Sequence, residues 1–188
     1  MWPASRLFLD VLQTSFHDTF ANAKSVIELG SGCGWLGMTI AQKFPSVNVT
    51  LTEQASSGGL HWLKHNVQLN PSIRVEAAEL DWRNVPNEIV SRSWSVVIGC
   101  ELVYSYEGAT LLPNVIFELL RDSVSSNCYY AHTLNRFPTV DERLIEEFSK
   151  QSLMYDVVYG EAAFLGRAAS QTELFPDTQL VVFRIRRS

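Results

Sequence analysis

The sequence predicts an α/β fold with a doubly wound, mostly parallel sheet and an antiparallel last strand. Three observations support this prediction. Short β-branched or apolar runs alternate with longer amphipathic stretches along the 188 residues, as in parallel sheets whose strands are joined by helices. The first apolar run leads directly into a glycine cluster and then a helix. The last two runs follow each other without a clear helix between them, which indicates an antiparallel final pair.

Each expected element follows from local pattern. The stretch from Trp94 to Gly99 is apolar throughout, as expected for a strand covered on both faces. Pro45 and Pro71 stop the helices that precede them. Seven strands are predicted, at residues 25–29, 47–52, 73–77, 94–99, 127–133, 154–159 and 179–185. The helices predicted between them cover residues 35–44, 56–69, 111–121 and 140–151. The chain length suits a single domain, residues 1–188, with one sizeable core.

Composition restricts the partners and the compartment. The net charge of −5 offers no broad basic face, so a nucleic-acid partner is not expected. Arg184, Arg186 and Arg187 are interpreted as a solvated strand end. The three cysteines form no CxxC pair and predict reduced thiols. No apolar run approaches the roughly 18 residues that span a bilayer, so we expect a cytoplasmic or nuclear protein without membrane attachment.

The glycine cluster after the first strand predicts a nucleotide-type ligand. Gly30, Gly32, Gly34 and Gly37 follow a strand and open a helix, where glycine lets a ligand approach the backbone. The spacing of Gly32, Gly34 and Gly37 also matches the dinucleotide-binding fingerprint, so the glycines alone do not identify the ligand. The acid before the loop, Glu28, is placed to orient it and to receive a cationic amino group through water.

A second acid lies roughly 20 residues further on. Glu53 ends the second strand, where a carboxylate can accept hydrogen bonds from both hydroxyls of a ribose. This pairing of a glycine loop with a distal acid favours a ribose-containing ligand over a turn required only for packing.

Several segments together resemble a known family. They are Trp2–Ser5 before the first helix, the loop from Glu28 to Gly37, residues 63–70 with Asn66, Glu79–Trp82 after the third strand, and Gly99–Tyr104 at the end of the fourth. In this order they resemble the seven-β-strand methyltransferases that use S-adenosylmethionine (SAM), and within them the eukaryotic protein lysine methyltransferase group called family 16. The resemblance covers the chain up to about Tyr104. It implies a Rossmann-like class I methyltransferase domain with SAM as cofactor and a protein lysine as methyl acceptor.

The resemblance also assigns cofactor contacts. It implies that Gly30, Ser31 and Gly32 contact the methionine part of SAM and that Glu53 binds the ribose. Trp82, with Asp81 beside it, would flank the adenine, for which an aromatic face is suited. Cys100 would line the pocket through its backbone, and Trp2 matches a family tryptophan close to the cofactor. Family members usually carry further residues before the segment that Trp2 opens, so we expect access to the acceptor site to differ here.

Glu101 and Tyr104 match the catalytic-loop motif of the family, written Asp-x-x-Tyr. The acid here is glutamate, one methylene longer. Its carboxylate is expected at the carboxyl end of the fourth strand, where it can hold a lysine ammonium or an amide by hydrogen bond. Tyr104 is the firmer candidate for positioning the acceptor, and the sequence identifies no general base.

Other functions remain open from the sequence. A methyltransferase for a small molecule or another protein side chain fits the same residues. A catalytically weak SAM-binding interaction protein is favoured by glutamate at 101, and a nicotinamide-dependent dehydrogenase is disfavoured by Trp82 and Tyr104. His61 and His65 have a spacing that can bind zinc, but no third ligand is evident and no metal is predicted. His132 and Asn135 are weak candidates for the acceptor side of the cleft. A monomer is expected.

Overall fold

The structure is a computed structural model that describes residues 3–56, 58–120, 126–160 and 179–188. One seven-stranded sheet runs through this part of the chain. The strand order is β3-β2-β1-β4-β5-β7-β6. The strands are β1 Ser25–Leu29, β2 Asn48–Glu53, β3 Val75–Glu79, β4 Val96–Cys100, β5 Asn127–Leu134, β6 Leu153–Tyr159 and β7 Gln179–Arg187. β7 pairs antiparallel with both β5 and β6, and the other pairs are parallel. The predicted fold class and antiparallel final pair are confirmed.

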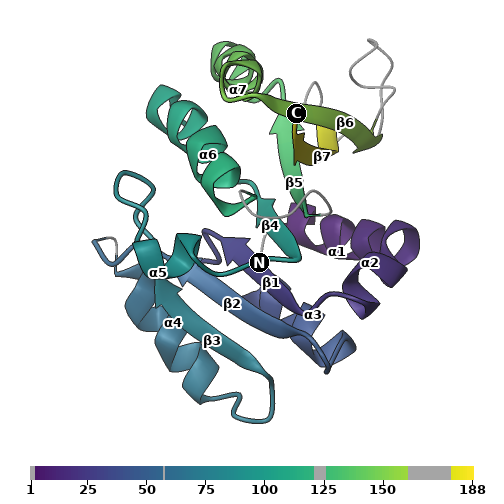
Figure 1. Cartoon of the computed structure of the whole chain (residues 1–188), viewed down its shortest axis with the longest axis vertical. Coiled ribbons are helices and arrows are strands. Elements are labelled where there is room, and N and C mark those ends of the chain that lie inside the picture. The colour runs from purple at the N-terminus through teal and green to yellow at the C-terminus, as the bar shows by residue number, and fades with distance from the viewer. Residues whose placement is uncertain (1–2, 57, 121–125, 161–178) are drawn as a thin grey trace.

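Helices cover both faces of this sheet (Figure 1). The first face is packed by α1 Pro3–Ser15, α2 His17–Ala21, α3 Trp35–Lys43 and α4 Gly59–Gln68. The second face is packed by α5 Asn87–Val90, α6 Tyr106–Leu119 and α7 Pro138–Lys150. The helix predicted at 111–121 begins five residues earlier than expected, because the Ser105 side chain caps it by accepting from the Gly108 amide at 3.1 Å. The short α2 and α5 were not predicted.

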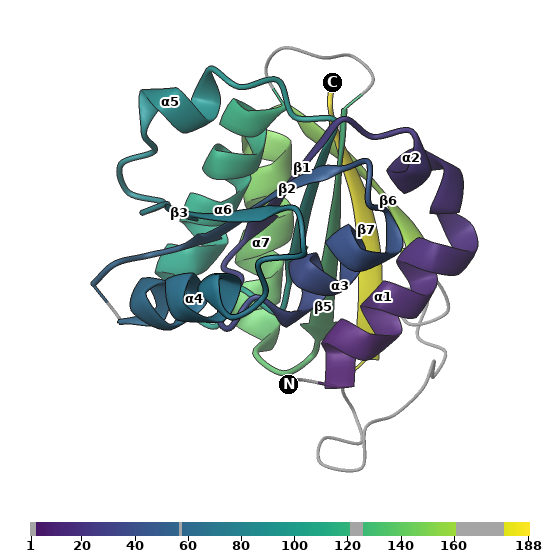
Figure 2. The same ribbon diagram turned by 90° about the horizontal axis from the view of Figure 1, so that it is seen from below.

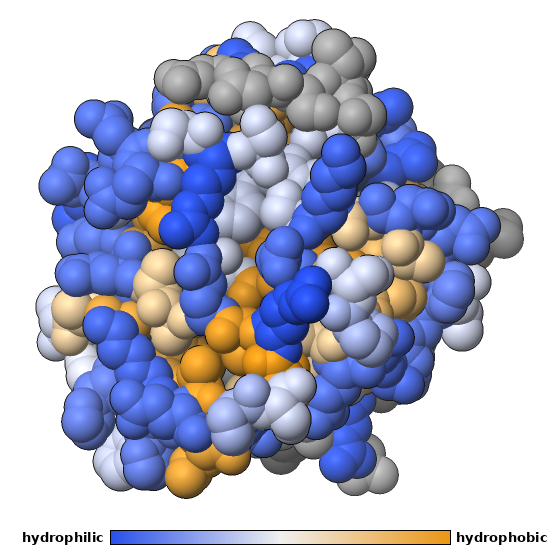
Figure 3. Space-filling model, turned by 60° about the horizontal axis from the view of Figure 1, so that its bottom comes forward, coloured by the Kyte–Doolittle hydropathy of each residue, from blue (hydrophilic) through white to orange (hydrophobic). Residues whose placement is uncertain are grey.

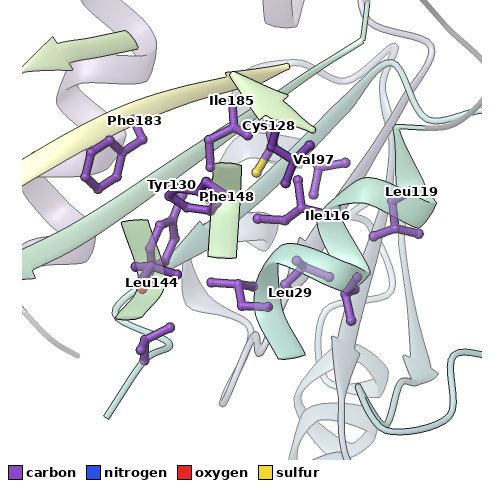
Figure 4. Packing of buried hydrophobic residues seen from close by; sticks show 14 of the residues in the cluster. Leu29, Val97, Ile116, Leu119, Cys128, Tyr130, Leu144, Phe148, Phe183 and Ile185 are labelled. Atoms are coloured by element: carbon purple, nitrogen blue, oxygen red, sulfur yellow. The ribbon is translucent and has the colours of Figure 1, made fainter. Parts of the chain in front are cut away.

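Side-chain alternation along the central strands builds two cores. In β1, Val26 packs into the core of the first face and Ile27 into that of the second. The same alternation places Tyr129 and Tyr130 of β5 on opposite faces, as the period of two in a strand requires. Figure 4 shows the second core, where Tyr130, Phe148 and residues of β7 pack between the sheet and the helices.

The two edges of the sheet carry charged side chains. On the edge strand β3, Glu76 and Glu79 are exposed, and Glu76 pairs with Arg92. Charges of this kind oppose pairing of an edge strand with another chain.

On the face that Figure 3 brings forward, an area of hydrophobic residues is bordered by hydrophilic ones.

The C-terminal arginines differ from the expected solvated strand end. Arg184 and Arg186 of β7 both pair with Asp156 of the edge strand β6, at 2.7 and 2.9 Å. The guanidinium of Arg187 lies 3.7 Å from the ring centre of Phe117 on α6, a cation–π contact. These side chains therefore tie the last strand to its neighbours. The three cysteines are free thiols, as predicted.

The order of the strands fixes where a ligand can bind. Within the sheet, β1 has β2 as its neighbour on one side and β4 on the other. Loops that leave β1 and β4 therefore diverge, and a crevice opens at the carboxyl ends of these strands. Figure 2 shows the end of β5 and the beginning of α1 at the same end of the molecule. Among the described residues, no helix is long and apolar enough to cross a membrane.

Phe183 tests the contribution of β7 to the second core. Its ring is fully buried and packs against Tyr130, Phe148 and Tyr155. We expect Phe183→Ala to lower the free energy of unfolding by about 3–5 kcal/mol, because it removes buried apolar area and leaves a cavity. The matched control is Met154→Ala on β6, whose side chain is 49% exposed and whose cost should be about 0.5 kcal/mol. Urea unfolding measures both, and equal losses would contradict this packing.

Candidate functional site

Two adjoining pockets lie at the carboxyl ends of the central strands. Gly30, after β1, and Glu101, after β4, line both of them. The first has a volume of ≈ 360 Å³ and is also lined by Glu53, Gln54, Leu80, Asp81, Trp82, Arg83, Leu102, Tyr104, Ser105, Glu107, Gly108 and Leu111. The second, of ≈ 220 Å³, is also lined by Ser5, Glu28, Ser31, Gly32, Cys33, Trp35, Leu36 and Cys100. Together they form one cleft, and it is lined by all the described residues to which the resemblance assigned a cofactor contact or a catalytic role.

Glu28 holds the glycine loop from beneath. Its side chain is buried, and Oε2 accepts a hydrogen bond from the Gly37 amide at 3.0 Å. A Cβ at Gly37 would lie 2.2 Å from Leu51 and 2.5 Å from that oxygen, so the close approach requires glycine. Burial raises the pKa of Glu28 to about 8, with a smaller increase from the charge of Glu53, against hydrogen bonds from Ser31 and Gly37 that lower it. Glu28 therefore holds the turn in place, and its expected contact with a cationic amino group stays a prediction.

Ser31 joins the loop to the neighbouring strand β2. Its amide donates to the Thr52 carbonyl at 2.8 Å, and its hydroxyl oxygen accepts from the Thr52 amide at 3.1 Å. The next residue, Gly32, has a φ of +55° and donates its amide to Glu53 Oε2 at 2.9 Å. The loop is therefore rigidly set before any ligand enters. Open space surrounds the position of a Cβ at Gly32, so its backbone faces the pocket.

The wall of the first pocket contains the predicted adenine-side residues. Trp82 and Asp81 follow β3, and both line the same pocket as Glu53. Asp81 Oδ1 accepts from the Arg83 amide at 3.0 Å, while Arg83 Nε pairs with Glu107 of α6 at 2.9 Å. This ion pair bridges the loop after β3 and the beginning of α6. Arg83 and Glu107 were not predicted, because their contact joins segments that are 24 residues apart.

The wall of the second pocket contains Cys100 and Ser5. The Ser5 hydroxyl lies 3.6 Å from Cys100 Sγ, which brings α1 to the end of β4. Burial raises the pKa of Cys100 to about 12, with a smaller opposing effect of the Ser5 hydrogen bond, so this thiol stays protonated at neutral pH. Trp2, predicted to lie close to the cofactor, is outside the described residues.

Glu101 and Tyr104 meet where the two pockets join. Glu101 has a φ of +55°, an unusual value for a residue other than glycine and one that often marks functional sites. The Tyr104 hydroxyl donates a hydrogen bond to the Glu101 carbonyl oxygen, and the Tyr104 side chain is 47% exposed. Burial raises the pKa of Tyr104, as does the charge of Glu101, whereas Arg136 lowers it through its charge and a hydrogen bond. The pair predicted from the motif is therefore assembled in the structure.

Arg136 is a functional candidate that sequence reasoning missed. It follows β5 and its Nη1 pairs with Glu101 Oε2 at 2.9 Å, with side chains 20% and 3% exposed. The other oxygen of Glu101, Oε1, is buried and has no hydrogen-bond partner among the described residues. A single arginine in a loop carries no motif. The available signal was its position directly after the fifth strand, at the same edge of the sheet as Glu101.

His132 and Asn135, the weaker candidates, do not reach the cleft. His132 is buried, and its ring nitrogens lie 3.0 Å from the Tyr130 hydroxyl and 2.8 Å from Asp141 Oδ1. Asn135, with a φ of +64°, donates its amide to Asp141 Oδ2 at 2.7 Å. Both residues therefore lie behind the cleft, where they shape the corner between β5 and α7.

His61 and His65 lie on α4 with Trp62 between them. Both imidazoles meet the Trp62 ring edge-on, with ring centres 5.7 and 5.9 Å apart. Within the described ranges of the chain, no group of three or more His, Cys, Asp or Glu side chains is arranged to hold a metal ion.

The raised pKa of Glu28 predicts a pH-dependent stability. Between pH 4.5 and about 8 the folded protein holds a proton on Glu28 that the unfolded chain has lost. The contribution of Glu28 to the free energy of unfolding therefore falls as pH rises through this window. Glutamine does not titrate. We therefore expect the free energy of unfolding of Glu28→Gln, relative to that of the wild type, to rise by on the order of 4 kcal/mol between pH 5 and pH 8. Urea unfolding of both proteins at the two pH values measures this, and parallel pH profiles would contradict it.

Comparisons with known proteins find a relative by sequence and solved structures that share the fold. A protein of Schizosaccharomyces pombe, UPF0665 family protein C23C4.06c, is 28% identical in an alignment of 127 positions that covers 64% of this chain. The chain spans 38% of that relative's length. Among solved structures, the delta-N METTL16 MTase domain matches with a TM-score of 0.66 and 12% identity over 100% of this chain and 84% of that one. Precorrin-6y C5,15-methyltransferase from Geobacter metallireducens matches with a TM-score of 0.62 and 11% identity over 98% and 87%.

A family model described as lysine methyltransferase matches residues 1–151. This range contains the glycine loop, Glu53, Trp82 and the Glu101–Tyr104 motif, so it includes the residues that line the cleft. Coclaurine N-methyltransferase, solved with N-methylheliamine and S-adenosylhomocysteine (SAH), shares the fold with a TM-score of 0.54 and 19% identity over 69% of this chain and 36% of its own. The expected cofactor, SAM, is that of the family and the fold. The chain belongs to the lysine methyltransferase family.

Proposed function

We propose that this protein transfers a methyl group from SAM to a lysine side chain of a partner protein. The observation that supports the proposal most is the joining of Glu101 and Tyr104 at the carboxyl end of β4, between the two pockets. An acceptor held by these side chains would meet the cleft at its centre, between the glycine loop and the loop with Trp82. A partner protein in the cytoplasm or nucleus, rather than a nucleic acid, suits the acidic composition.

The residues of the cleft fit SAM part by part. The open backbone at Gly32 and the buried carboxyl group of Glu28 suit the methionine end, which carries an amino and a carboxyl group. Glu53 and Trp82 share the larger pocket and suit a ribose and a purine. SAM, when bound, supplies an electrophilic methyl: the acceptor nitrogen's lone pair forms the N–C bond, the C–S electron pair stays on sulfur, and the positive charge passes to nitrogen.

The protein's contribution to this reaction is chiefly positioning. Its glycine loop is preset by Ser31 and Glu28, so little ordering is needed on binding. Free lysine has a pKa near ~10.4, and only the uncharged amine has the lone pair that attacks. The buried carboxylate of Glu101 and the Tyr104 hydroxyl are placed to hold this amine through its hydrogens.

A second function is favoured by one contact. Arg136 already forms an ion pair with Glu101, so the Glu101 carboxylate is not an unpaired negative charge that could bind a lysine ammonium. A SAM-binding interaction protein with weak turnover fits this contact, as does transfer to a small molecule or to a histidine side chain. Turnover on proteins separates these functions.

Methyl transfer can be tested with SAM labelled in its methyl group, added with the protein to a cell lysate. We expect a labelled protein band, and mass spectrometry should place the methyl on lysine. Tyr104→Phe should lower kcat about tenfold to hundredfold by removing a hydroxyl beside the reacting atoms. Tyr106→Phe is the matched control, since this neighbouring tyrosine is 58% exposed and does not line the cleft. Label on small molecules or histidine, or SAM binding without label, would overturn the lysine proposal.

Gly32 tests the assignment of the second pocket. Alanine at this position keeps space for its Cβ but strains the left-handed backbone, at a cost of about 1–2 kcal/mol in stability. We expect Gly32→Ala to weaken SAM binding at least about tenfold, because the new methyl occupies the ligand's approach. Gly58, with a φ of +75° and open space around it, provides the control: Gly58→Ala should cost similar stability and leave SAM affinity unchanged. Calorimetric titration with SAM measures the affinity of both variants. If Gly32→Ala bound SAM as tightly as the wild type, the methionine end of SAM could not be assigned to the second pocket.

A further inference from the structure

The contact between Arg136 and Glu101 neutralises a buried carboxylate at the centre of the cleft. Glu101 is 6% exposed, and one of its oxygens meets Nη1 of Arg136 at 2.9 Å. The guanidinium also hydrogen-bonds the Tyr104 side chain. One cation from the loop after β5 therefore holds both residues of the motif that follows β4. The pair has no net charge, so it is a weaker site for a lysine ammonium than an unpaired carboxylate.

The remaining oxygen of Glu101 lacks a donor. Oε1 is buried from water and receives no hydrogen bond from the described residues. Buried carboxylate oxygens are almost always hydrogen-bonded, because an unmade bond carries the full cost of desolvation. Glu101 lines both pockets, so a molecule held in the cleft is the natural source of the donor.

The corner that presents Arg136 is fixed by buried polar contacts. Asp141 of α7 accepts from the Asn135 amide with Oδ2 and faces His132 with Oδ1. His132 in turn meets the Tyr130 hydroxyl, whose oxygen accepts from the Leu102 amide at 3.4 Å. This chain of contacts ties α7 and β5 to the residue that follows Glu101. Arg136 is thus delivered to the cleft by a rigid support rather than by a free loop.

We propose that Arg136 is a positioning residue of the methyl-acceptor site: it neutralises Glu101, holds Glu101 and Tyr104 together, and leaves Oε1 of Glu101 to accept a hydrogen bond from an acceptor amine in its uncharged form. This inference rests on the proposed function and specifies how the same site takes its substrate. An ammonium at Oε1 would lie within a few ångströms of the guanidinium, where the two positive charges repel each other. An uncharged amine meets no such repulsion and keeps the lone pair that attacks the methyl carbon.

The first test needs no methyl acceptor. SAM carries a positive sulfonium and SAH does not, so the ratio of their dissociation constants reports the charge near the sulfur. In Arg136→Gln the bare carboxylate of Glu101 should favour SAM over SAH by about tenfold more than in the wild type. The double variant Glu101→Gln/Arg136→Gln should return the ratio to the wild-type value. Arg92→Gln, which breaks an arginine–carboxylate pair on the β3 edge, is the control and should leave the ratio unchanged.

The second test is the pH dependence of kcat, which reports ionisation in the enzyme–substrate complex. Without Arg136, the bare carboxylate stabilises an ammonium, so the acid limb of kcat in Arg136→Gln should move up by about one pH unit. Arg136→Lys keeps the charge and should keep the limb near its wild-type position, even at a lower kcat. A merely structural role would lower kcat at every pH and leave the limb in place.

Other groups near Glu101 must not be mistaken for the acceptor. The titratable side chains that interact with Glu101 are Cys100, Tyr104, Tyr130 and Arg136. Glu28 lines the second pocket with it, and Glu53, Asp81, Arg83 and Glu107 line the first. His132 and Asp141 lie one and two contacts further away, behind Tyr130. Burial raises the pKa of Cys100 to about 12 and that of Tyr130 well above its usual value, so both are neutral in the working range. Glu28, with a pKa of about 8, titrates within it. The pH profiles are therefore repeated in a Glu28→Gln background, where the displacement caused by Arg136→Gln should persist.

The outcomes separate the two proposals. If the wild type transfers no methyl to protein lysine, the proposed function fails, and the ratio of SAM to SAH affinity still tests whether Arg136 neutralises Glu101. If the wild type is active but Arg136→Gln changes neither the ratio nor the acid limb, Arg136 does not set the charge of the acceptor site and the inference is overturned.

Discussion

The cleft depends on one buried contact, between the carboxyl group of Glu28 and the amide of Gly37. This hydrogen bond closes the turn from β1 into α3 and pulls the helix against the strand so closely that no side chain fits at residue 37. Ser31 and Gly32 are then fixed to the end of β2 by their own hydrogen bonds. The loop that faces the ligand is therefore rigid because of groups that lie behind it. The cost is a carboxyl group with a pKa of about 8, since burial disfavours its charge.

Strand order converts this local turn into a site. From β1 the chain continues toward β2, and from β4 it continues toward β5, in opposite directions across the sheet. The loops after β1 and β4 therefore separate and leave space at the carboxyl ends of these two strands. Gly30 and Glu101 are the first residues of these two loops, and both have positive φ. At both positions the chain leaves its strand through the left-handed region of the backbone. The two pockets meet at this point of divergence.

The acceptor side is built by a different part of the chain. Arg136 comes from the corner between β5 and α7, which is held by Asp141 and flanked by Leu134 and Val140 of the second core. Stability and electrostatics are linked here: the same packing of β5, β7 and α7 that closes the core also sets the position of the cation that neutralises Glu101. The two ends of the cleft thus rest on opposite faces of the sheet, the glycine loop on the first core and Arg136 on the second.

The sequence by itself determined the fold class, the alternation of elements and the candidate residues up to Tyr104. The fold class, the glycine loop, Glu28 and Glu53 follow from local signals, namely apolar periodicity, glycine after a strand and acids at strand ends. The resemblance to a family supplied the other candidates, Trp2, Asp81, Trp82, Cys100, Glu101 and Tyr104. Only the tertiary structure decided how Glu28 is used, that Glu101 has a left-handed backbone and that Arg136 pairs with it. Contacts between residues 101 and 136, or 83 and 107, join segments distant in the chain, and no local pattern encodes them. Strand order brings such pairs together, so a lone arginine after β5 acquires meaning only once β4 and β5 lie side by side.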